Sequence, residues 1–369
     1  MSTKEDKIRK PKSGVMGWIW IPIIAVVVAY SGLLRTNDPW HHPYANLLLF
    51  TPWRVQLRTY WEQNLKIDKG VKIEPSHVAT IEAKDYTFST LRAASENFRY
   101  PVIIRDFFKG TPAMEKWVTQ DYLPSRLGDF IIPVINNAIV GKVQNNRTNV
   151  AFGPTFREIL NDENSKLYLF FPVKSRFNTN GSDVGSAEKL QQEVNDIVRE
   201  DLELDRIFKG FGTKAHKTFV GSQLIVGQGS DDSAQTTGTG WHCAIGNNWF
   251  AQVAGTKRWY FMDQKYSSFM HPLRGGKFNM MTGTTRMSEF VGHIPLRYGD
   301  VRAGDLLYNP DWEWHTIQNH KGLSIGVPIR EANYSLAFQN NFLFSSVVLW
   351  NVITEKVGID INGYPLNYQ

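Results

Sequence analysis

The pattern of hydrophobic and polar positions first marks out one long apolar run near the N-terminus. Residues 13–34 carry no charged side chain and are rich in Val, Ile and Trp. As a helix these 22 residues would span ~33 Å, which matches a bilayer hydrocarbon core of ~30 Å. Trp18, Trp20 and Tyr30 suit the membrane interface. The run predicts a single transmembrane anchor, and the alternative is a cleaved signal peptide with its cleavage site at residues 29–31.

A second amphipathic pattern follows the anchor. We assign residues 35–75 to a juxtamembrane helical segment, in which residues 53–61 place basic side chains between apolar ones at helical spacing. A helix of this kind can lie on a membrane surface. A helix packed on the following domain explains the pattern equally well, and the sequence leaves both open.

After this segment the sequence pattern changes to short apolar runs that are broken by Gly, Pro, Asn and Asp. Residues 101–108, 167–171 and 218–226 each have the composition of a buried strand. Residues 187–208 form a charged stretch with helical spacing. Many short strands separated by turns predict a sandwich or barrel, and we assign one such domain to residues 76–335.

The last segment, residues 336–369, is apolar but too interrupted to span a bilayer. Its pattern fits a core helix, a dimer helix or a membrane-surface helix. Because apolar helical faces are usually buried against protein, core or dimer packing is the default. A homodimer formed through these C-terminal helices is therefore among the predictions.

Composition narrows the class of protein. With 42% hydrophobic and 13% aromatic residues the chain is not disordered, and its single cysteine excludes a disulfide scaffold. The net charge is +6, from 41 basic and 35 acidic side chains. Residues 1–12 hold five basic and two acidic side chains, so 5 − 2 places +3 in this tail. A basic tail before the anchor predicts a cytosolic N-terminus, and the lack of later basic blocks predicts no nucleic-acid partner.

Two histidines stand out by their surroundings. His242 is followed by an Asn-x-Phe-Ala-Gln-x-x-Gly-x-Lys-Arg pattern that runs from Asn248 through Arg258 and includes Lys257. His315 ends the run GDLLYNPDWEWH, which begins at Gly304. Imidazole nitrogens are common ligands of iron and other transition metals.

This region, over about residues 95–330, resembles the cupin-like JmjC proteins, which are Fe(II)- and 2-oxoglutarate-dependent dioxygenases. The strand at 101–105 (PVIIR) also resembles the entry strand of that family. The resemblance implies an all-β core, a double-stranded β-helix or jelly roll, with flanking helices that make the fold α+β overall. With the anchor, the predicted chain is a transmembrane helix followed by a cupin-like domain.

The resemblance also assigns site residues and cofactors. It implies that His242 and His315 bind Fe(II), and that Lys257 and Thr239 hold the distal carboxylate of 2-oxoglutarate. Asn248 and Tyr168 are implied to lie beside this cofactor, and O₂ is the co-substrate. A cytosolic N-terminus before the anchor places the domain either in a lumen or outside the cell. Because 2-oxoglutarate must be present where the enzyme works, we expect the lumen of the endoplasmic reticulum or Golgi.

The chain departs from the family pattern at one ligand. The family completes its iron site with a carboxylate two residues after the first histidine, and here that residue is Ala244. Residues i and i+2 of a strand share a face, so His242 and Ala244 would point inward and Cys243 outward. A methyl group cannot bind a metal, so one coordination position is open.

Three interpretations follow from Ala244. In the first, chloride fills the open position and the protein is a radical halogenase, because alanine or glycine makes this room in related non-haem iron halogenases. In the second, a carboxylate from elsewhere completes the site of a hydroxylase. In the third, the domain only binds a ligand. The candidate carboxylates for the second interpretation are Asp231, Asp232, Asp311 and Glu313.

The substrate is less constrained than the chemistry. The anchor, the amphipathic segment and the apolar C-terminal tail favour a small-molecule substrate of amphipathic or lipid-like character. An anchor that only sets the location of the domain explains the same features.

Overall fold

The structure is a computed structural model, and it describes most of the chain after the predicted anchor. The predicted tail, anchor and amphipathic helix lie outside the described residues, as does most of the C-terminal tail. Within the described residues, no helix combines the length and the apolar character that a bilayer crossing requires. The described residues are 67–136, 138–140, 147–170, 184–209, 219–232, 235–270, 273–274, 280–282, 291–341, 345 and 349.

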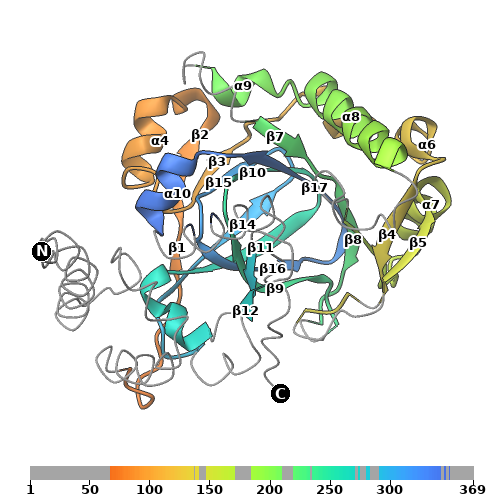
Figure 1. Cartoon of the computed structure of the whole chain (residues 1–369). Helices are drawn as coiled ribbons and strands as arrows, with labels where there is room; N and C mark the ends of the chain where they lie inside the picture. The colour runs from red at the N-terminus through yellow and green to blue at the C-terminus, as the bar shows by residue number, and fades with distance from the viewer. Residues whose placement is uncertain are drawn as a thin grey trace, which may run out of the picture.

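Two sheets form the core of the described part (Figure 1). The larger one is here called the major sheet. Its strands, in spatial order, are β2 (Ala79–Glu82), β3 (Val102–Arg105), β15 (Leu306–Asn309), β10 (Asn247–Ala254), β17 (Gly322–Glu331), β8 (Ile225–Gly229), β6 (Tyr168–Phe170), β4 (Ile131–Ile135) and β5 (Arg147–Ala151), while β7 (Phe219–Ser222) pairs with β17.

The smaller sheet, here called the minor sheet, faces the major one. Its strands, in spatial order, are β1 (Ser76–His77), β14 (Leu296–Arg302), β11 (Thr256–Met262), β16 (Trp314–Asn319), β9 (Gly238–Ala244), β13 (Met280–Thr282) and β12 (Leu273–Arg274). Chain-consecutive strands alternate between the sheets: β9 leads into β10, β10 into β11, and β15 into β16. This alternation is the winding expected of a jelly roll.

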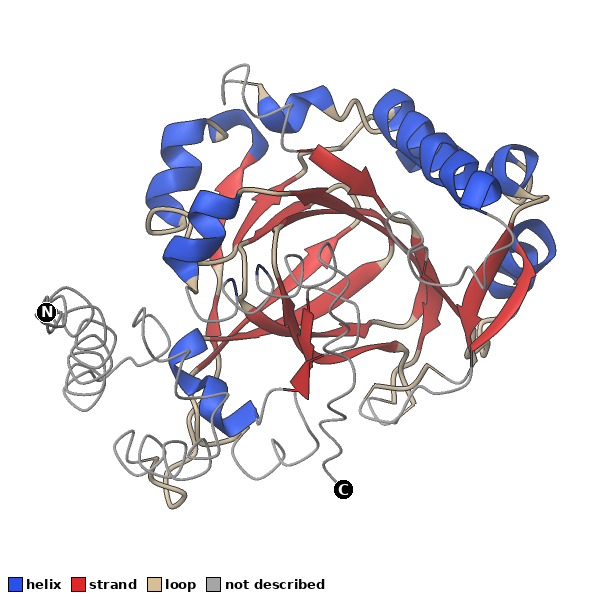
Figure 2. Cartoon of the chain, in the orientation of Figure 1, coloured by secondary structure: helices blue, strands red, loops and turns tan. Residues whose placement is uncertain are grey.

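Helices lie outside the strands of this barrel (Figure 2). They are η2 (Ala83–Asp85), α4 (Phe88–Ala94), α5 (Pro112–Lys116), α6 (Tyr122–Leu127), α7 (Phe152–Asn161), α8 (Val184–Asp201), α9 (Asp205–Phe208), η4 (Gln264–Met270) and α10 (Tyr334–Asn340). The predicted all-β core with flanking helices is thereby confirmed for the described residues.

Strand alternation divides the apolar side chains into two cores. Val327 and Ile329 of β17 belong to the core that the major sheet shares with the helices. Phe250 of β10 and Trp259 of β11 belong to the core between the two sheets. Because neighbouring residues of a strand point to opposite faces, Arg330 is directed into the barrel, on the side of Phe250.

The predicted strands at 101–108 and 167–171 are found as β3 and β6, but two predicted elements are divided. The strand at 218–226 becomes β7 and β8, and the interruption lies opposite Pro328, which has no N–H for the ladder. The helix at 187–208 becomes α8 and α9, because Glu203 between them adopts a left-handed φ of 50°.

The start of the predicted C-terminal tail packs on the domain. Helix α10 crosses the predicted domain boundary at residue 335. Beyond it, Ser345 is buried, and its hydroxyl accepts a hydrogen bond from Trp312 Nε1 at 2.8 Å. Its own O–H donates to the carbonyl of Ala337. This part of the tail therefore contributes to the core, and dimer formation stays a prediction.

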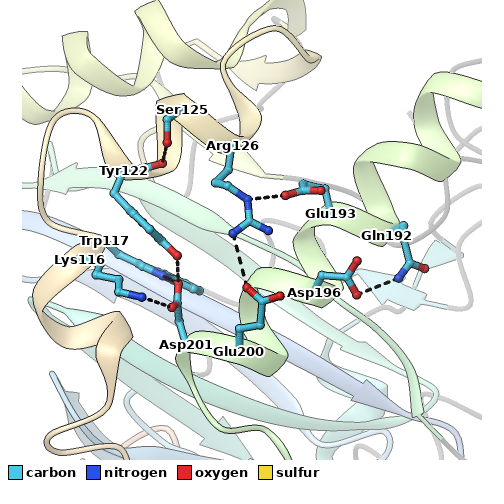
Figure 3. Close-up of polar contacts among 10 residues, drawn as sticks. All are labelled: Lys116, Trp117, Tyr122, Ser125, Arg126, Gln192, Glu193, Asp196, Glu200 and Asp201. Atoms are coloured by element: carbon cyan, nitrogen blue, oxygen red, sulfur yellow. Dashed lines mark hydrogen bonds and ion pairs between the residues drawn. The ribbon is translucent and has the colours of Figure 1, made fainter.

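One buried carboxylate fastens α8 to the helices beside it (Figure 3). Asp201 accepts hydrogen bonds from Trp117 Nε1 at 2.8 Å, from the Tyr122 hydroxyl at 2.7 Å and from Lys116 Nζ at 3.0 Å. Burial acts to raise the pKa of Asp201, but these three donors outweigh it and the pKa lies below its usual value. The carboxylate is therefore ionised when folded, and it links three helical segments.

We expect Asp201→Asn to destabilise the domain by about 2–3 kcal/mol, since one amide NH₂ would face a donor in a buried site. The depressed pKa stabilises the fold above the unfolded pKa near ~3.9, and this contribution is lost as pH falls through the folded pKa. Thermal unfolding followed by circular dichroism between pH 3 and 7 measures both effects. Asp196→Asn, on the same helix beside Gln192, is the control, with a change within ~0.5 kcal/mol.

Candidate active site

The two motif histidines are neighbours on adjacent strands of the minor sheet. His242 on β9 and His315 on β16 are partners in the strand register. Their ring centroids are 4.2 Å apart, with an angle of 57° between the rings. The indole of Trp259 stacks on His315 with its centroid 5.2 Å away. Packing thus fixes the orientation of at least one ring.

Both imidazoles have the protonation pattern of metal ligands. Nδ1 of His242 lies 2.8 Å from the carbonyl of Gly240, and Nδ1 of His315 lies 2.8 Å from the carbonyl of Glu313. A carbonyl only accepts, so Nδ1 carries the proton in each ring and Nε2 keeps its lone pair. Burial lowers the pKa of His242 to about 4 and that of His315 well below its usual value. Both rings are therefore neutral at physiological pH, as metal binding requires.

Ala244 lies where the sequence pattern leads one to expect a third ligand. It follows His242 by two residues on β9, and the intervening Cys243 is completely buried, while its two neighbours are half-buried. This burial pattern is the predicted alternation, with Cys243 on the opposite face. The carbonyl of Ala244 accepts a hydrogen bond from Trp312 N at 2.9 Å, which holds the turn before His315 against β9.

The four carboxylates that could have replaced the missing ligand lie elsewhere. Within the described residues, no group of three His, Cys, Asp or Glu side chains could hold a metal. Asp311 accepts from the Gly246 amide at 2.5 Å, and Glu313 lies 3.9 Å from Arg297. Asp231 pairs with Lys321 at the surface, and Asp232 is exposed. Among these candidates none completes a triad with the histidines.

Lys257 is a buried cation without a carboxylate partner in the described residues. Its side chain is inaccessible to solvent, and Nζ donates to Asn319 Oδ1 at 2.5 Å. Nζ also lies 5.5 Å from the centroid of the Tyr168 ring. Burial lowers the pKa of Lys257 to about 7. A lysine in this state gains stability from any anion that reaches it.

Several buried polar atoms of the predicted site residues lack hydrogen-bond partners in the described part of the chain. They include the hydroxyls of Tyr168 and Thr239 and the side-chain oxygen of Asn248. Hydroxyl donors and an ammonium group are suited to a carboxylate, and buried polar groups normally find partners. The residues that the resemblance assigned to 2-oxoglutarate thus fit a dicarboxylate, and the histidine pair fits one end of it at a metal.

Gly326 leaves the space that the Lys257 side chain occupies. A Cβ at this position would overlap the ring of Phe250 and lie 3.2 Å from Lys257 Cε. We expect Gly326→Ala to shift the lysine and weaken 2-oxoglutarate binding by about tenfold, with a loss of about 1–3 kcal/mol of stability. Isothermal titration and thermal unfolding measure the two effects. Gly292→Ala, where a Cβ would meet nothing within 4 Å, should change neither.

Comparison with known families agrees with this geometry. Residues 95–329 match the model of the cupin-like domain family. The match covers more than half of the chain, which therefore belongs to this family. Its JmjC-type members are similar to Fe(II)- and 2-oxoglutarate-dependent oxygenases and typically use these two cofactors. No curated protein matches the chain.

Sequence reasoning missed two polar residues that face the barrel. Asn319 is the acceptor for Lys257, and Arg330 lies opposite Asn248 in the β10–β17 register. Neither belongs to a recognisable motif. The alternation of β17 carried a signal for Arg330, because Ile325, Val327 and Ile329 occupy the opposite face.

Proposed function

We propose that this chain is an Fe(II)- and 2-oxoglutarate-dependent radical halogenase that chlorinates an unactivated carbon. The observation that supports this proposal is the combination of a paired His242 and His315 with Ala244 on the same strand face. The remaining residues of the pattern fit a dicarboxylate, so the departure is confined to one ligand. A vacancy at that position leaves room for an anion supplied from solution.

Each described side chain then has a defined task. His242 and His315 offer two neutral Nε2 lone pairs on one face of the site. Lys257 and the hydroxyls of Thr239 and Tyr168 bind the distal carboxylate of 2-oxoglutarate and orient it. The methyl group of Ala244 leaves a coordination position free. When bound, iron with 2-oxoglutarate and O₂ supplies an oxidant able to remove hydrogen from an unactivated C–H bond.

The proposed reaction balances with the named co-substrates. A substrate C–H bond and a 2-oxoglutarate carbon–carbon bond break, and a C–Cl bond forms. One oxygen atom of O₂ enters succinate and the other leaves as water, with the substrate hydrogen and one proton. Four electrons reduce O₂, two from decarboxylation to CO₂ and two from the substrate carbon with chloride. No further reductant is required.

The test is mass spectrometry of the products formed by the purified full chain. Fe(II), 2-oxoglutarate and O₂ are supplied with a membrane lipid extract, in parallel buffers that contain chloride or bromide. A product with the chlorine isotope pattern, replaced by the bromine pattern in bromide, supports halogenation. A product that gains only oxygen identifies a hydroxylase. A protein that binds neither Fe(II) nor 2-oxoglutarate would be a binding module.

We further propose that residues 13–34 anchor the enzyme, with the domain in an intracellular lumen and a lipid-like substrate. The support is the charge-free apolar run after a basic tail. We expect deletion of residues 1–34 to move the protein from the membrane pellet to the supernatant after an alkaline wash. Deletion of residues 1–12 alone is the control and should leave it in the pellet. If the longer deletion stays bound, residues 35–75 hold the membrane instead.

A further inference from the structure

A second cation faces the barrel beside the histidine pair. Three polar residues lie side by side on neighbouring strands of the major sheet. Asn248 of β10 is in register with Asn309 of β15 on one side and with Arg330 of β17 on the other. All three share the inward face, because Phe250 and Leu307 two residues away on β10 and β15 belong to the inner core. Asn309 lies beside one of the two histidines, with its side-chain amide nitrogen 3.4 Å from His315 Nδ1.

The guanidinium of Arg330 has few polar partners among the described residues. Within the described residues it donates from Nε to Gln223 Oε1 at 3.2 Å and has no carboxylate within ion-pair distance. It is half-buried, and burial lowers its pKa to about 10. Its positive charge also contributes, after burial, to the lowered pKa of both His242 and His315. Arg330 thus lies on the inward face in the same register row as Asn309, whose side-chain amide is 3.4 Å from His315.

The formal charges of the proposed site sum to a positive net charge. A divalent iron, Lys257 and Arg330 together bring +4, and 2-oxoglutarate brings −2. The ordinary site of the family would hold one more negative charge from its carboxylate, which Ala244 removes. A metal at the histidine pair and the guanidinium of Arg330, which has no carboxylate partner among the described residues, repel each other unless an anion lies between them. The open position at Ala244 and the positive charge of Arg330 thus both favour an anionic ligand.

We propose that Arg330 holds a small anion, either a halide or the carboxylate group of a substrate, in the position that Ala244 leaves open beside His242 and His315. This inference rests on the proposed function only in that an external anion occupies the vacancy. Arg330 acts as a specificity-determining residue, because the planar guanidinium can bind a carboxylate with two parallel bonds or a halide with one or two.

The test uses the full chain loaded with Co(II) and 2-oxoglutarate under nitrogen, at constant ionic strength set by sodium methanesulfonate. Chloride and formate are titrated separately, and the visible absorption of Co(II) reports the anion at the metal. We expect saturable changes in the wild type and a chloride Kd at least ~10-fold weaker in Arg330→Gln. Arg302→Gln, which removes an exposed charge from β14, should match the wild type.

A second readout separates anion binding from a structural role. Coupling between two bound ligands is reciprocal. In the wild type, chloride should therefore increase the affinity for Co(II) by the same factor as Co(II) increases the affinity for chloride. In Arg330→Gln, Co(II) binding without chloride should become tighter, since repulsion is removed, and the chloride effect should shrink. A merely structural arginine would give weaker Co(II) binding in the variant.

The outcomes separate this inference from the proposed function. Equal chloride and formate affinities in wild type and Arg330→Gln overturn the role of Arg330 and leave halogenation standing. Binding of formate but not chloride, with loss in the variant, supports Arg330 and overturns halogenation. No anion effect in the wild type overturns both. If Arg330→Gln does not fold, Arg330→Lys decides, because an unchanged formate-to-chloride ratio without the guanidinium fork would contradict the proposal.

Discussion

Ala244→Asp is expected to abolish chloride binding at the metal and to tighten metal binding by more than ~10-fold. The new carboxylate would share the strand face of His242, two residues earlier, and would complete a set of two histidines and one carboxylate. Loss of a group that only hydrogen-bonds to a metal ligand changes metal affinity by about 10–100-fold, so a carboxylate that binds the metal directly should act at least as strongly. The carboxylate would also repel a halide and pair with the charge of Arg330.

The measurement is the Co(II) titration of Ala244→Asp with and without chloride, followed by Fe(II)-dependent product analysis. Ala244→Asn is the matched control, because it has the same size without the charge and should lose chloride through crowding but gain little metal affinity. If Ala244→Asp binds chloride as the wild type does, position 244 is not the vacancy. If metal affinity is unchanged, the side chain at 244 does not reach the metal.

The sequence specified the site better than the boundaries of the elements that carry it. Thr239 and His242 are three residues apart on β9, so strict alternation would place them on opposite faces. The irregular register between β9 and β16 instead sets them opposite Ile317 and His315, which share the inward face. The structure accordingly brings Lys257, Thr239 and Tyr168 to the interior and places His242 against His315. Their functional roles rest on the proposal above. Alternation along β9 accounts for the shared face of His242 and Ala244, whereas the face of Thr239 depends on its pairing with β16.

What the sequence could not supply depends on contacts between distant strands. Pro328 interrupts the pairing of β17 with the segment at 218–226, a partner that no local pattern identifies. Asp201 ends α8 among three donors from an earlier part of the chain. Arg330 becomes a site residue only when β17 lies beside β10. In each case the partner is set by tertiary pairing, which local spacing does not identify even where, as for Arg330, it indicates the face.

The lysine at the other end of the site leads to the second large expected effect. Lys257→Met should raise the 2-oxoglutarate Kd by at least ~30-fold, because it removes the cation of a buried charge pair. In the ligand-free protein the same change should increase stability by about 1–3 kcal/mol. A buried cation with one neutral acceptor costs desolvation energy that an apolar side chain does not.

The pH dependence of both quantities follows from the pKa of Lys257, which burial lowers to about 7. The unfolded chain binds a proton at this lysine up to about pH 10.4, so wild-type stability should rise between pH 7 and 10, and the variant should lack this rise. Affinity for 2-oxoglutarate should fall above pH 7, because the carboxylate needs the protonated amine. Calorimetric titration of the Co(II)-loaded protein and thermal unfolding test both. If Lys257→Met binds 2-oxoglutarate as tightly as the wild type does, the dicarboxylate binds elsewhere. A variant that gains stability without losing affinity would show that the buried lysine does not bind this anion.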